Sequence, residues 1–411
     1  MIGGGAAGFF CAANAARMNP ALKVLLLEKS AKVLQKVKVS GGGRCNVTHA
    51  CFEISQMIKR YPRGERFLKK AFHHFFTSDT IKWFEERGVA LKTEADGRMF
   101  PVTDRSQTII DCLLQEANKY GVELKLQTAV EKIEYHEGTW HIIARNSNTS
   151  GPSLLKADYI CIACGGFPKP EHFNWLTGPT GHTIQFPVPS LFTFNLPAHP
   201  IRQLMGLSVS RAQVKLAGFK QITEGPVLVT HWGLSGPAIL RMSAFAARDL
   251  AAANYQYIVI INWMPDYNEN NLREKILQHR QVKGNQKLVN TEWISLPQRL
   301  WEFLITQSGA DPDLRWADLP AAGQNKLIKN LCGQEFAANG KTTFKEEFVT
   351  AGGINLSEID PNTMQSRLQP RLYFAGEIMD VDGITGGFNF QNAWTSGYIA
   401  AKAIANENSL H

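Results

Sequence analysis

The stretch Gly3-Gly4-Gly5-Ala6-Ala7-Gly8, close to the start of the chain, decides the fold class. It matches the pattern G-x-G-x-x-G, in which the first glycine permits a tight turn, the second lets the backbone approach a pyrophosphate, and the third lets a helix pack closely on a strand. An Ala-rich helix candidate, AAGFFCAANAARM at 6–18, follows at once. The free N–H groups and the dipole at the start of such a helix favour an anion. The stretch therefore predicts a dinucleotide-binding turn.

An acidic residue stands at the spacing that this turn requires. Residues 23–29 (KVLLLEK) form a continuous apolar run, which is typical of a strand buried in a parallel sheet. Glu28 ends this run twenty positions beyond Gly8, where a carboxylate can accept a hydrogen bond from a ribose hydroxyl. Only Met1 and Ile2 precede the glycines. We therefore expect the first strand of the unit to be missing or unusually short.

The other end of the chain carries a second group of glycines after a strand candidate. The strand in RLYFAGE ends at Gly376-Glu377, and Asp380 and Gly386-Gly387-Phe388-Asn389 follow before a helix candidate. A helix entered through such a turn can direct its positive end at an anionic centre, such as the N1–C2=O edge of a reduced flavin. A nicotinamide dehydrogenase usually completes its cofactor site within one contiguous domain. A site shared between the two ends of the chain favours FAD over NAD.

Between these ends the pattern changes twice. Helix candidates at 78–88 and 106–121, two strands within 129–145 and a strand within 157–166 continue the α/β pattern. After a proline cluster at 187–200, short strands are followed by helical segments around 268–282, 297–308 and 320–333. We predict a Rossmann-like α/β domain in two pieces, 1–190 and 346–411, with an inserted β-rich domain at 191–345 that carries a helical sub-domain around 265–333.

Composition sets broad limits on what the protein is. In 411 residues, 44% are apolar and 19% are charged, so a disordered chain is excluded. We find no apolar run of ~18 residues and no signal peptide, and seven thinly spread cysteines indicate a reducing cytoplasm. A net charge of +8 is compatible with an anionic cofactor, an anionic substrate or RNA.

Several motifs together resemble one known family. They are GGGAAG, LLLEK, SGGGRCNVT, GRMFP (97–101), THWGLSGPAI (230–239), TAGGINL (350–356) and LYFAGEIMDVDGITGGFNFQNAWTSGYIA (372–400). The chain resembles the BaiN-like, or aminoacetone-oxidase-like, FAD-dependent oxidoreductases of the glutathione-reductase-like superfamily. This resemblance implies a Rossmann-like FAD domain in two sequence pieces, with a β-barrel-like and a helical insertion between them.

The resemblance also implies which residues bind FAD. They are Gly3, Gly5, Ala7 and Gly8 at the pyrophosphate; Glu28, Lys29 and Val130 toward the adenosine; Lys36 before the loop SGGGRCN, and Ser40, Gly42, Arg44, Cys45 and Asn46 within it; Ala163 and Gly165 after the middle strand; Gly376, Glu377 and Asp380 at the ribityl and diphosphate; and Gly386, Gly387, Phe388 and Asn389 toward the flavin. The sequence departs from the family pattern at Cys164, where threonine is commoner, and at 167–182, which lacks a second glycine-rich run.

Other chemistries fit the sequence less well. Gly340-Lys341-Thr342 ends like a phosphate-binding loop but lacks its first glycine, and Gly233-Leu234-Ser235-Gly236 lacks the last glycine of a nucleophile elbow. His73-His74 has no H-E-x-x-H context, so no metal site is expected. Cys161-x-x-Cys164 lies along a strand, where residues three apart point to opposite faces. Cys45 and Cys51 are the stronger redox candidates, although five residues separate them where flavin disulfide reductases have four.

The predicted function is that of an FAD-dependent oxidoreductase. It transfers a hydride between flavin N5 and a small organic substrate, with NAD(P)H or oxygen as the other redox partner, because no second dinucleotide-binding unit is visible. His231, Arg44 and Gln391 are the candidates for contact with the substrate. Neither a membrane nor a nucleic acid is an expected partner, and the oligomeric state is open.

Two other function classes compete with this prediction. A flavoprotein that binds or modifies RNA is suggested by pI ≈ 9.0 and by the basic residues Lys59, Arg60, Arg63, Arg66, Lys69 and Lys70. Apolar residues interleave these charges at helical spacing, however, as on a solvated helix face. A structural or sensory flavin module without turnover is the third class.

Overall fold

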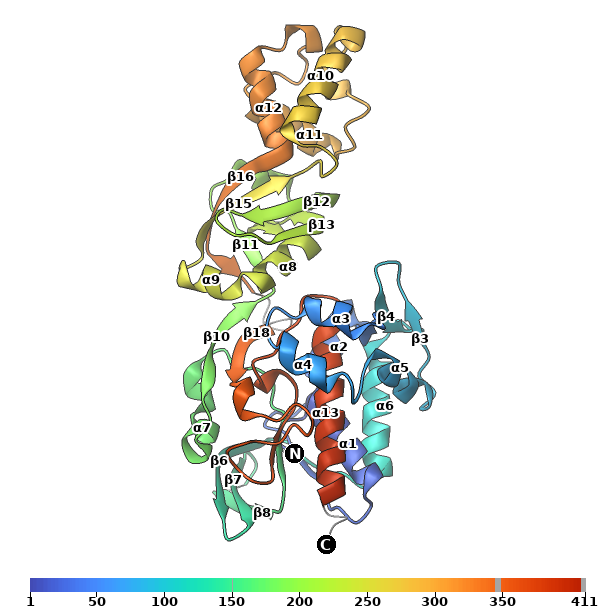
Figure 1. Ribbon diagram of the computed structural model, residues 1–411, viewed down its shortest axis with the longest axis vertical. Helices are drawn as coiled ribbons and strands as arrows, with labels where there is room; N and C mark the ends of the chain where they lie inside the picture. Colours follow the sequence, from blue (N-terminus) through green and yellow to red (C-terminus); the bar gives the residue numbers. More distant parts are fainter. Residues whose placement is uncertain (150, 344–348, 408–411) are drawn as a thin grey trace. The chain divides into compact units, whose positions relative to one another are not determined.

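The computed structural model describes residues 1–149, 151–343 and 349–407, and the chain divides into two compact units (Figure 1). The terminal unit contains Met1–Pro189 and Lys345–His411, and the inserted unit contains Ser190–Phe344. Each unit is described by itself below. The terminal unit contains every residue for which FAD binding is predicted.

A parallel sheet lies at the centre of the terminal unit. Strand β1 (Leu25–Leu27) pairs with β5 (Glu123–Lys125), and β9 (Ile160–Ile162) pairs with β19 (Leu372–Phe374), both in parallel register. Ile2 forms parallel bridges with Leu27 and Ile162 and so joins the two pairs in the order β19-β9-Ile2-β1-β5. The first strand is therefore present, but it is reduced to a bridge at one residue. The α/β fold class predicted from the sequence is confirmed.

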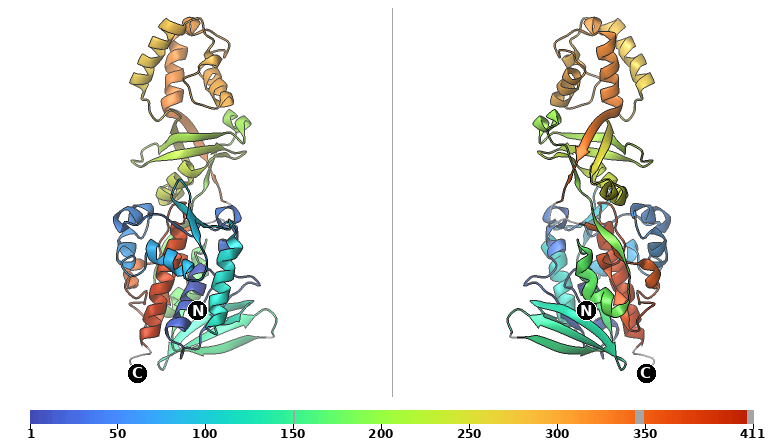
Figure 2. Two further views of the ribbon diagram at one scale, coloured as in Figure 1. Left: turned by 90° about the vertical axis from the view of Figure 1, so that its right-hand side faces the viewer. Right: turned by 90° about the vertical axis from the view of Figure 1, so that its left-hand side faces the viewer.

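Two helices from opposite ends of the chain pack against this sheet and against each other. Helix α1 (Ala6–Met18) is buried from Ala7 to Ala16, as its Ala-rich and Phe-rich sequence predicts for a helix without a polar face. Helix α13 (Phe388–Glu407) runs alongside it (Figure 2). A Cβ atom added to Gly397 would lie 2.9 Å from the carbonyl oxygen of Ala7, so glycine permits this close approach. Phe10 and Trp394 fill the interface, with ring centroids 5.2 Å apart.

The rest of the terminal unit consists of short helices and small sheets around this centre. The predicted helices at 78–88 and 106–121 are α5 (Thr77–Glu85) and α6 (Ser106–Lys119), and the strands predicted within 129–145 are β6 (Thr128–His136) and β7 (Thr139–Asn146). The other elements are α2 (Gln35–Gly43), α3 (Ile54–Met57), α4 (Glu65–Ala71), α7 (Asn174–Thr180), β2 (Thr48–His49), β3 (Leu91–Thr93), β4 (Arg98–Pro101), β8 (Pro152–Ala157), β10 (Ile184–Ser190), β18 (Val349–Ile354) and the 3-10 turns η6 (Leu356–Glu358) and η7 (Gly376–Ile378). The small sheets have the orders β2-β4-β3 and β6-β7-β8, and β10 pairs with β18.

The inserted unit has its own sheet and its own core. Seven antiparallel strands stand in the order β16-β15-β12-β13-β14-β11-β17. They are β11 (Thr193–Asn195), β12 (Ser208–Leu216), β13 (Ile222–Val229), β14 (Gly233–Ser235), β15 (Gln256–Asn262), β16 (Gln334–Asn339) and β17 (Lys341–Thr342), with helices α8 (Pro237–Phe245), α9 (Ala247–Ala252), α10 (Glu269–Lys283), α11 (Gln298–Gln307) and α12 (Ala321–Gly333). The last three helices are the helical segments expected from the sequence. Thr193 in β11 pairs with Thr342 in β17, so the chain enters and leaves the unit on neighbouring strands.

Among the described residues, no helix combines the length and the apolar character that a membrane span requires.

Candidate cofactor site

The glycine turn lies at the carboxyl edge of the parallel sheet. The Gly3 amide donates to the Leu27 carbonyl oxygen at 2.8 Å, and with φ +112° an added Cβ would lie 2.5 Å from the carbonyl oxygen of Ala163. A Cβ on Gly8 would lie 1.9 Å from the Gly3 oxygen. Gly5 precedes α1, which no side chain of the described residues caps, and a Cβ on Gly5 would touch no described atom. The first N–H groups of α1 are thus available to an anion in the space beside Gly5.

The acidic residue predicted for the ribose lies directly beside this turn. One carboxylate oxygen of Glu28 accepts a hydrogen bond from the Gly4 amide at 2.7 Å, and the other accepts from the Ser30 amide and hydroxyl at 2.8 Å. The Thr128 amide donates to the Glu28 carbonyl oxygen at 2.8 Å, which brings the start of β6, and with it Val130, to the same edge. Lys29 lies nearby with its ammonium 5.9 Å from the ring centroid of Phe167.

The ends of β9 and β19 complete this edge of the sheet. The Ala163 amide donates to the Ile2 oxygen at 2.8 Å, and Gly165 (φ +77°) borders open space. After β19, Glu377 accepts from the Thr350 amide at 2.9 Å and pairs with the Lys36 ammonium at 2.6 Å. The Thr350 hydroxyl is buried and has no hydrogen-bond partner among the described residues.

The loop SGGGRCN forms the irregular end of α2. Gly41, Gly42 and Gly43 all have positive φ (58°, 69° and 84°), so three successive residues occupy a region that favours glycine. A Cβ on Gly42 would touch no described atom. With its amide oriented to satisfy both neighbours, Asn46 accepts from the Gly387 amide and donates to the Thr48 carbonyl oxygen, each at 3.0 Å. The loop thus contacts the turn predicted to face the flavin.

That second turn leads into α13 and is tightly constrained. Gly386 and Gly387 have φ +131° and +91°, and a Cβ on Gly387 would lie 2.6 Å from the Thr48 oxygen. The Asn389 side chain accepts from the Gly383 amide at 2.8 Å and donates to its carbonyl oxygen at 3.0 Å. Behind the turn, the Gly376 amide donates to Ser396 at 2.8 Å, and Asp380, 8% exposed, bonds through its amide to the Ile354 oxygen.

These features fit an extended dinucleotide. Gly5, Gly42 and Gly165 border open space, α1 begins without a side-chain cap, and the hydroxyl of Thr350 lacks a partner among the described residues. A pyrophosphate supplies acceptors for the N–H groups of α1, and a ribose supplies a donor for Glu28.

Comparison with known proteins decides the family. The family model described as "HI0933-like protein Rossmann domain" matches residues 1–403. The chain belongs to the HI0933-like family. The resemblance to the BaiN-like FAD-dependent oxidoreductases is thereby confirmed, and the chain is an FAD-dependent oxidoreductase with a Rossmann-like FAD-binding fold.

Relatives of this flavoprotein extend over nearly its whole length. It is 33% identical to the ribosomal RNA dihydrouridine synthase of Escherichia coli K12, over 98% of this chain and 97% of that protein. It is 27% identical to the 3-dehydro-bile acid delta(4,6)-reductase of Clostridium scindens, over 98% of both chains.

Solved structures show the same fold at low sequence identity. The 3-ketosteroid-delta4-(5alpha)-dehydrogenase of Rhodococcus jostii RHA1 matches with a TM-score of 0.51 and 13% identity, over 97% of this chain and 95% of that one. The quinol fumarate reductase subunit FrdA of E. coli matches with a TM-score of 0.51 and 14% identity, over 99% of this chain and 69% of that one.

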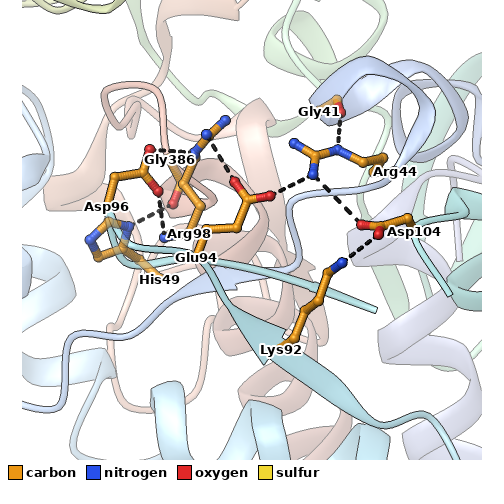
Figure 3. A network of polar contacts seen from close by, with 9 residues as sticks. All are labelled: Gly41, Arg44, His49, Lys92, Glu94, Asp96, Arg98, Asp104 and Gly386. Atoms are coloured by element: carbon orange, nitrogen blue, oxygen red, sulfur yellow. Dashed lines mark hydrogen bonds and ion pairs between the residues drawn. The ribbon is translucent and has the colours of Figure 1, made fainter. Parts of the chain in front are cut away.

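His49 is a residue of this flavoprotein's site that the sequence analysis missed. One nitrogen of its ring lies 3.1 Å from the Gly386 carbonyl oxygen (Figure 3). The ring also stacks on Phe388 with centroids 4.7 Å apart. Gly97 makes room for it, because a Cβ there would lie 2.6 Å from the other ring nitrogen. His49 directly follows the motif SGGGRCNVT, and nothing in that motif marks the histidine after it.

Arg44 does not present a free charge to a phosphate or an anionic substrate. Its guanidinium pairs with Glu94 at 2.5 Å and lies 3.6 Å from Asp104 (Figure 3). It also stacks on the ring of Phe100 at 4.0 Å. The hydrogen bond to Glu94 raises the pKa of Arg44 above its ordinary value. Two carboxylates already compensate this charge, and these contacts hold the loop beside β3 and β4. Contact of Arg44 with the cofactor or the substrate stays a prediction.

The other two predicted catalytic residues lie in different units of the chain. Gln391 is fully buried, accepts from the hydroxyls of Thr48 at 2.6 Å and Thr80 at 3.1 Å, and donates to Thr395 at 3.1 Å. Its amide joins α13 to neighbouring elements, while its predicted contact with substrate stays a prediction. His231 belongs to the inserted unit, where its exposed ring lies 4.6 Å from that of Trp232.

The thiols of the site are poor redox groups. Cys45 is fully buried, and burial raises the pKa of its thiol to about 12. A thiolate is the reactive form, so Cys45 is protonated and inert at neutral pH. Cys161 is buried in β9, and burial also raises the pKa of the Cys164 thiol to about 12. All seven cysteines are free, and no group of metal-binding side chains occurs among the described residues.

Proposed function

We propose that this flavoprotein reduces a carbon–carbon double bond that is conjugated to a carbonyl group. The shared chemistry of its two named relatives carries the proposal. Dihydrouridine is uridine in which the C5=C6 bond, conjugated to the C4 carbonyl, has become single. A 3-dehydro bile acid with double bonds at positions 4 and 6 has them conjugated to the C3 ketone. In both cases a hydride adds to an electrophilic carbon of the conjugated system, the β-carbon of uridine or the β- or δ-carbon of the dienone, and a proton adds to the neighbouring carbon that becomes saturated with it.

The balance of this reaction needs two electrons and two protons. When bound, reduced FAD supplies the hydride at N5, and NAD(P)H is the proposed source of the electrons, so that NAD(P)H, a proton and the alkene give NAD(P)⁺ and the saturated product. The role of the chain itself is to hold the flavin and to orient it. The N-terminus of α13 directs backbone N–H groups at the flavin's anionic edge, and the contacts of Asn46 and His49 fix the turn that places them.

A uracil base in RNA is the first candidate substrate. The E. coli relative, named for dihydrouridine in ribosomal RNA, shares 33% identity with this chain. A net charge of +8 and exposed basic residues on α4 are compatible with a polyanion. This ranks the RNA alternative of the sequence analysis above the small organic substrate that was predicted first. A small enone is the second candidate, and the C. scindens relative favours it.

The test uses the flavin as its own reporter. The protein is purified with FAD, and its visible spectrum is followed without oxygen after addition of NADH or NADPH. We expect NAD(P)H to bleach the flavin, and RNA transcripts containing uridine to restore the colour and gain dihydrouridine, detected by mass spectrometry. A small enone is the parallel acceptor. Restoration of colour by oxygen alone, with neither acceptor reduced, would point to an oxidase and contradict the proposal.

A further inference from the structure

A basic groove runs beside the turn predicted to face the flavin. It has a volume of about 860 Å³ and lies between Pro62–Lys70 and Leu356–Arg367, all within the terminal unit. Three cationic side chains line it, Arg66, Lys70 and Arg367, against one carboxylate, that of Glu65. Its apolar lining includes Phe67, Leu356 and Ile359. Cations beside apolar surface match a nucleotide, whose phosphate is anionic and whose base is flat and weakly polar.

Exposed basic residues stand on and just before α4, and two of them, Arg66 and Lys70, line the groove. Lys59, Arg60, Arg66, Lys69 and Lys70 are exposed, and in the part of the chain that the structure describes none of them forms an ion pair. Arg367, on the other wall, forms an ion pair with Asp360 at 3.9 Å and does not belong to this unpaired set. An unpaired cluster of this kind attracts a polyanion and releases its counterions on contact.

The wall of the groove formed by Pro62–Lys70 is joined by hydrogen bonds and an ion pair to the turn predicted to face the flavin. The Ile384 amide donates to the Arg60 oxygen at 2.9 Å, and the Tyr61 hydroxyl donates to the Phe388 oxygen at 2.7 Å. Arg63 forms a buried ion pair with Asp382, with 2.5 Å between Nε and Oδ1. These contacts join the residues immediately before α4 to the loop that leads into α13.

The wall formed by Leu356–Arg367 is joined to the same loop through the end of β18, which precedes it. Ile354, at the end of β18, bridges to Met379, and the Asp380 amide donates to the Ile354 oxygen at 3.1 Å. The segment Leu356–Arg367 follows directly. A chain of phosphates held in the groove therefore lies at a fixed place relative to the turn at Gly386 and Gly387.

We infer that this groove binds a single-stranded stretch of the substrate RNA, with phosphates at Arg66, Lys70 and Arg367, so that a neighbouring uracil reaches the flavin. The inference rests on the proposed function and names its substrate as a polynucleotide. The groove supplies affinity and register through the backbone, while the site beside the flavin selects the base. Bases of single-stranded segments can be turned outward toward such a site, unlike bases in a duplex.

The test is equilibrium binding of RNA to the oxidised, FAD-loaded protein. The double variant R66E/K70E is compared with K23E/K402E, which makes the same change of charge at two exposed lysines of the terminal unit that lie outside the groove. The probe is a uridine-containing single-stranded RNA of about 16 nucleotides. We expect R66E/K70E to bind about tenfold or more weakly, with a dependence of log K on log salt that is shallower by about 1.4, and K23E/K402E to bind like the parent.

The outcomes separate the groove from the proposed reaction. If the two double variants bind RNA equally well, or lose binding equally, the proposal that this groove binds RNA is wrong. Binding of phosphorylated peptides in preference to RNA would contradict it as well. Bound FAD, read from the visible spectrum, checks that each variant is folded. If R66E/K70E loses RNA binding but the parent reduces no uridine in RNA, the groove stands and the proposed reaction fails. If the parent reduces uridine and R66E/K70E binds as K23E/K402E does, the reaction stands and the groove fails.

Discussion

At the scale of single residues, the glycines of the site fall into two kinds. Gly8 is required by the protein itself, because its Cβ would clash with the Gly3 oxygen at 1.9 Å. Gly5 is not, because its φ of −90° and ψ of −172° suit any residue and its Cβ would meet no described atom. A substitution at Gly5 can therefore test the effect on FAD binding separately from the effect on the stability of the fold.

Gly5→Ala is expected to leave the FAD-free protein as stable as the parent and to weaken FAD binding by about tenfold or more, since a methyl group would occupy the place of the pyrophosphate. Thermal unfolding without FAD and fluorescence titration with FAD measure the two effects. Gly8→Ala is the contrasting variant and should destabilise the fold with or without FAD. An unchanged FAD affinity in Gly5→Ala would contradict the predicted position of the pyrophosphate.

Buried thiols predict how stability depends on pH. Burial raises the pKa of Cys45 and of Cys112 to about 12, whereas a thiol in an unfolded chain ionises near 8.5. A raised pKa in the folded state means that the stabilisation is complete below the unfolded pKa and is lost as pH rises toward the folded pKa. The relevant window is therefore about pH 8.5 to 12.

We expect each of these thiols to lower the free energy of unfolding by about 1.4 kcal/mol for each pH unit inside that window. Urea unfolding at pH 8, 9 and 10 measures the slope for the parent. Cys112→Ala should reduce this slope by the contribution of one thiol. The difference between parent and variant therefore separates the effect of Cys112 from that of tyrosines that ionise in the same pH range. Identical slopes for parent and variant would show that Cys112 ionises in the folded protein.

At the scale of elements, the buried pair Arg63–Asp382 links the segment before α4 to the loop before α13. Arg63 is 9% exposed and Asp382 is fully buried. Breaking such a pair leaves one charge buried without its partner, which costs about 3–5 kcal/mol. Arg63→Met should lower the free energy of unfolding by this amount, measured with urea. The double variant R63M/D382L should recover much of the loss, and failure to recover would mean that other contacts of Asp382 dominate.

Sequence alone predicted the elements whose signals are local. The helix at 6–18 has the predicted bounds, because its alanines and phenylalanines are buried on every side and Gly5 stands at its start. The two strands around 136–138 were found for the same reason, since alternation and a glycine turn mark a hairpin. The glycine turn and Glu28 lie side by side, as their positions at the ends of predicted elements suggest, since the Gly4 amide donates to the Glu28 carboxylate. Their contact with FAD, like that of Gly387, stays a prediction.

Tertiary partners decided the rest. Arg44 reads in the sequence as a free cation, and only the fold brings Glu94, Asp104 and the ring of Phe100 to it. Gln391 reads as an exposed amide at the start of a helix, yet Thr48, Thr80 and Thr395 surround it. The first strand could not be judged either, because the bridges of Ile2 to Leu27 and Ile162 depend on strands far along the chain.

At the scale of the whole molecule, the inserted unit should be removable. Thr193 and Thr342 are paired on neighbouring strands, so their Cα atoms are only about 5 Å apart and a linker of a few residues can join them. Replacing residues 194–341 by a short Gly-Ser linker should give a protein that still binds FAD and is yellow. The matching control is the inserted unit alone, which has its own apolar core and should fold without FAD. A colourless, unfolded product of the excision would contradict this division of labour.

The position of α13 near the end of the chain also has a consequence for biosynthesis. Phe10 of α1 is buried against Trp394, and the turn that precedes α13 completes the edge that begins at Gly3. At 5–20 residues per second, the ribosome needs roughly 20 to 80 s to travel from the first of these residues to the last. During that time Phe10 can pack against Trp83 and Phe84 of α5, but Trp394 is missing and the predicted edge for the cofactor is incomplete. We therefore expect FAD to bind only after α13 has been synthesised.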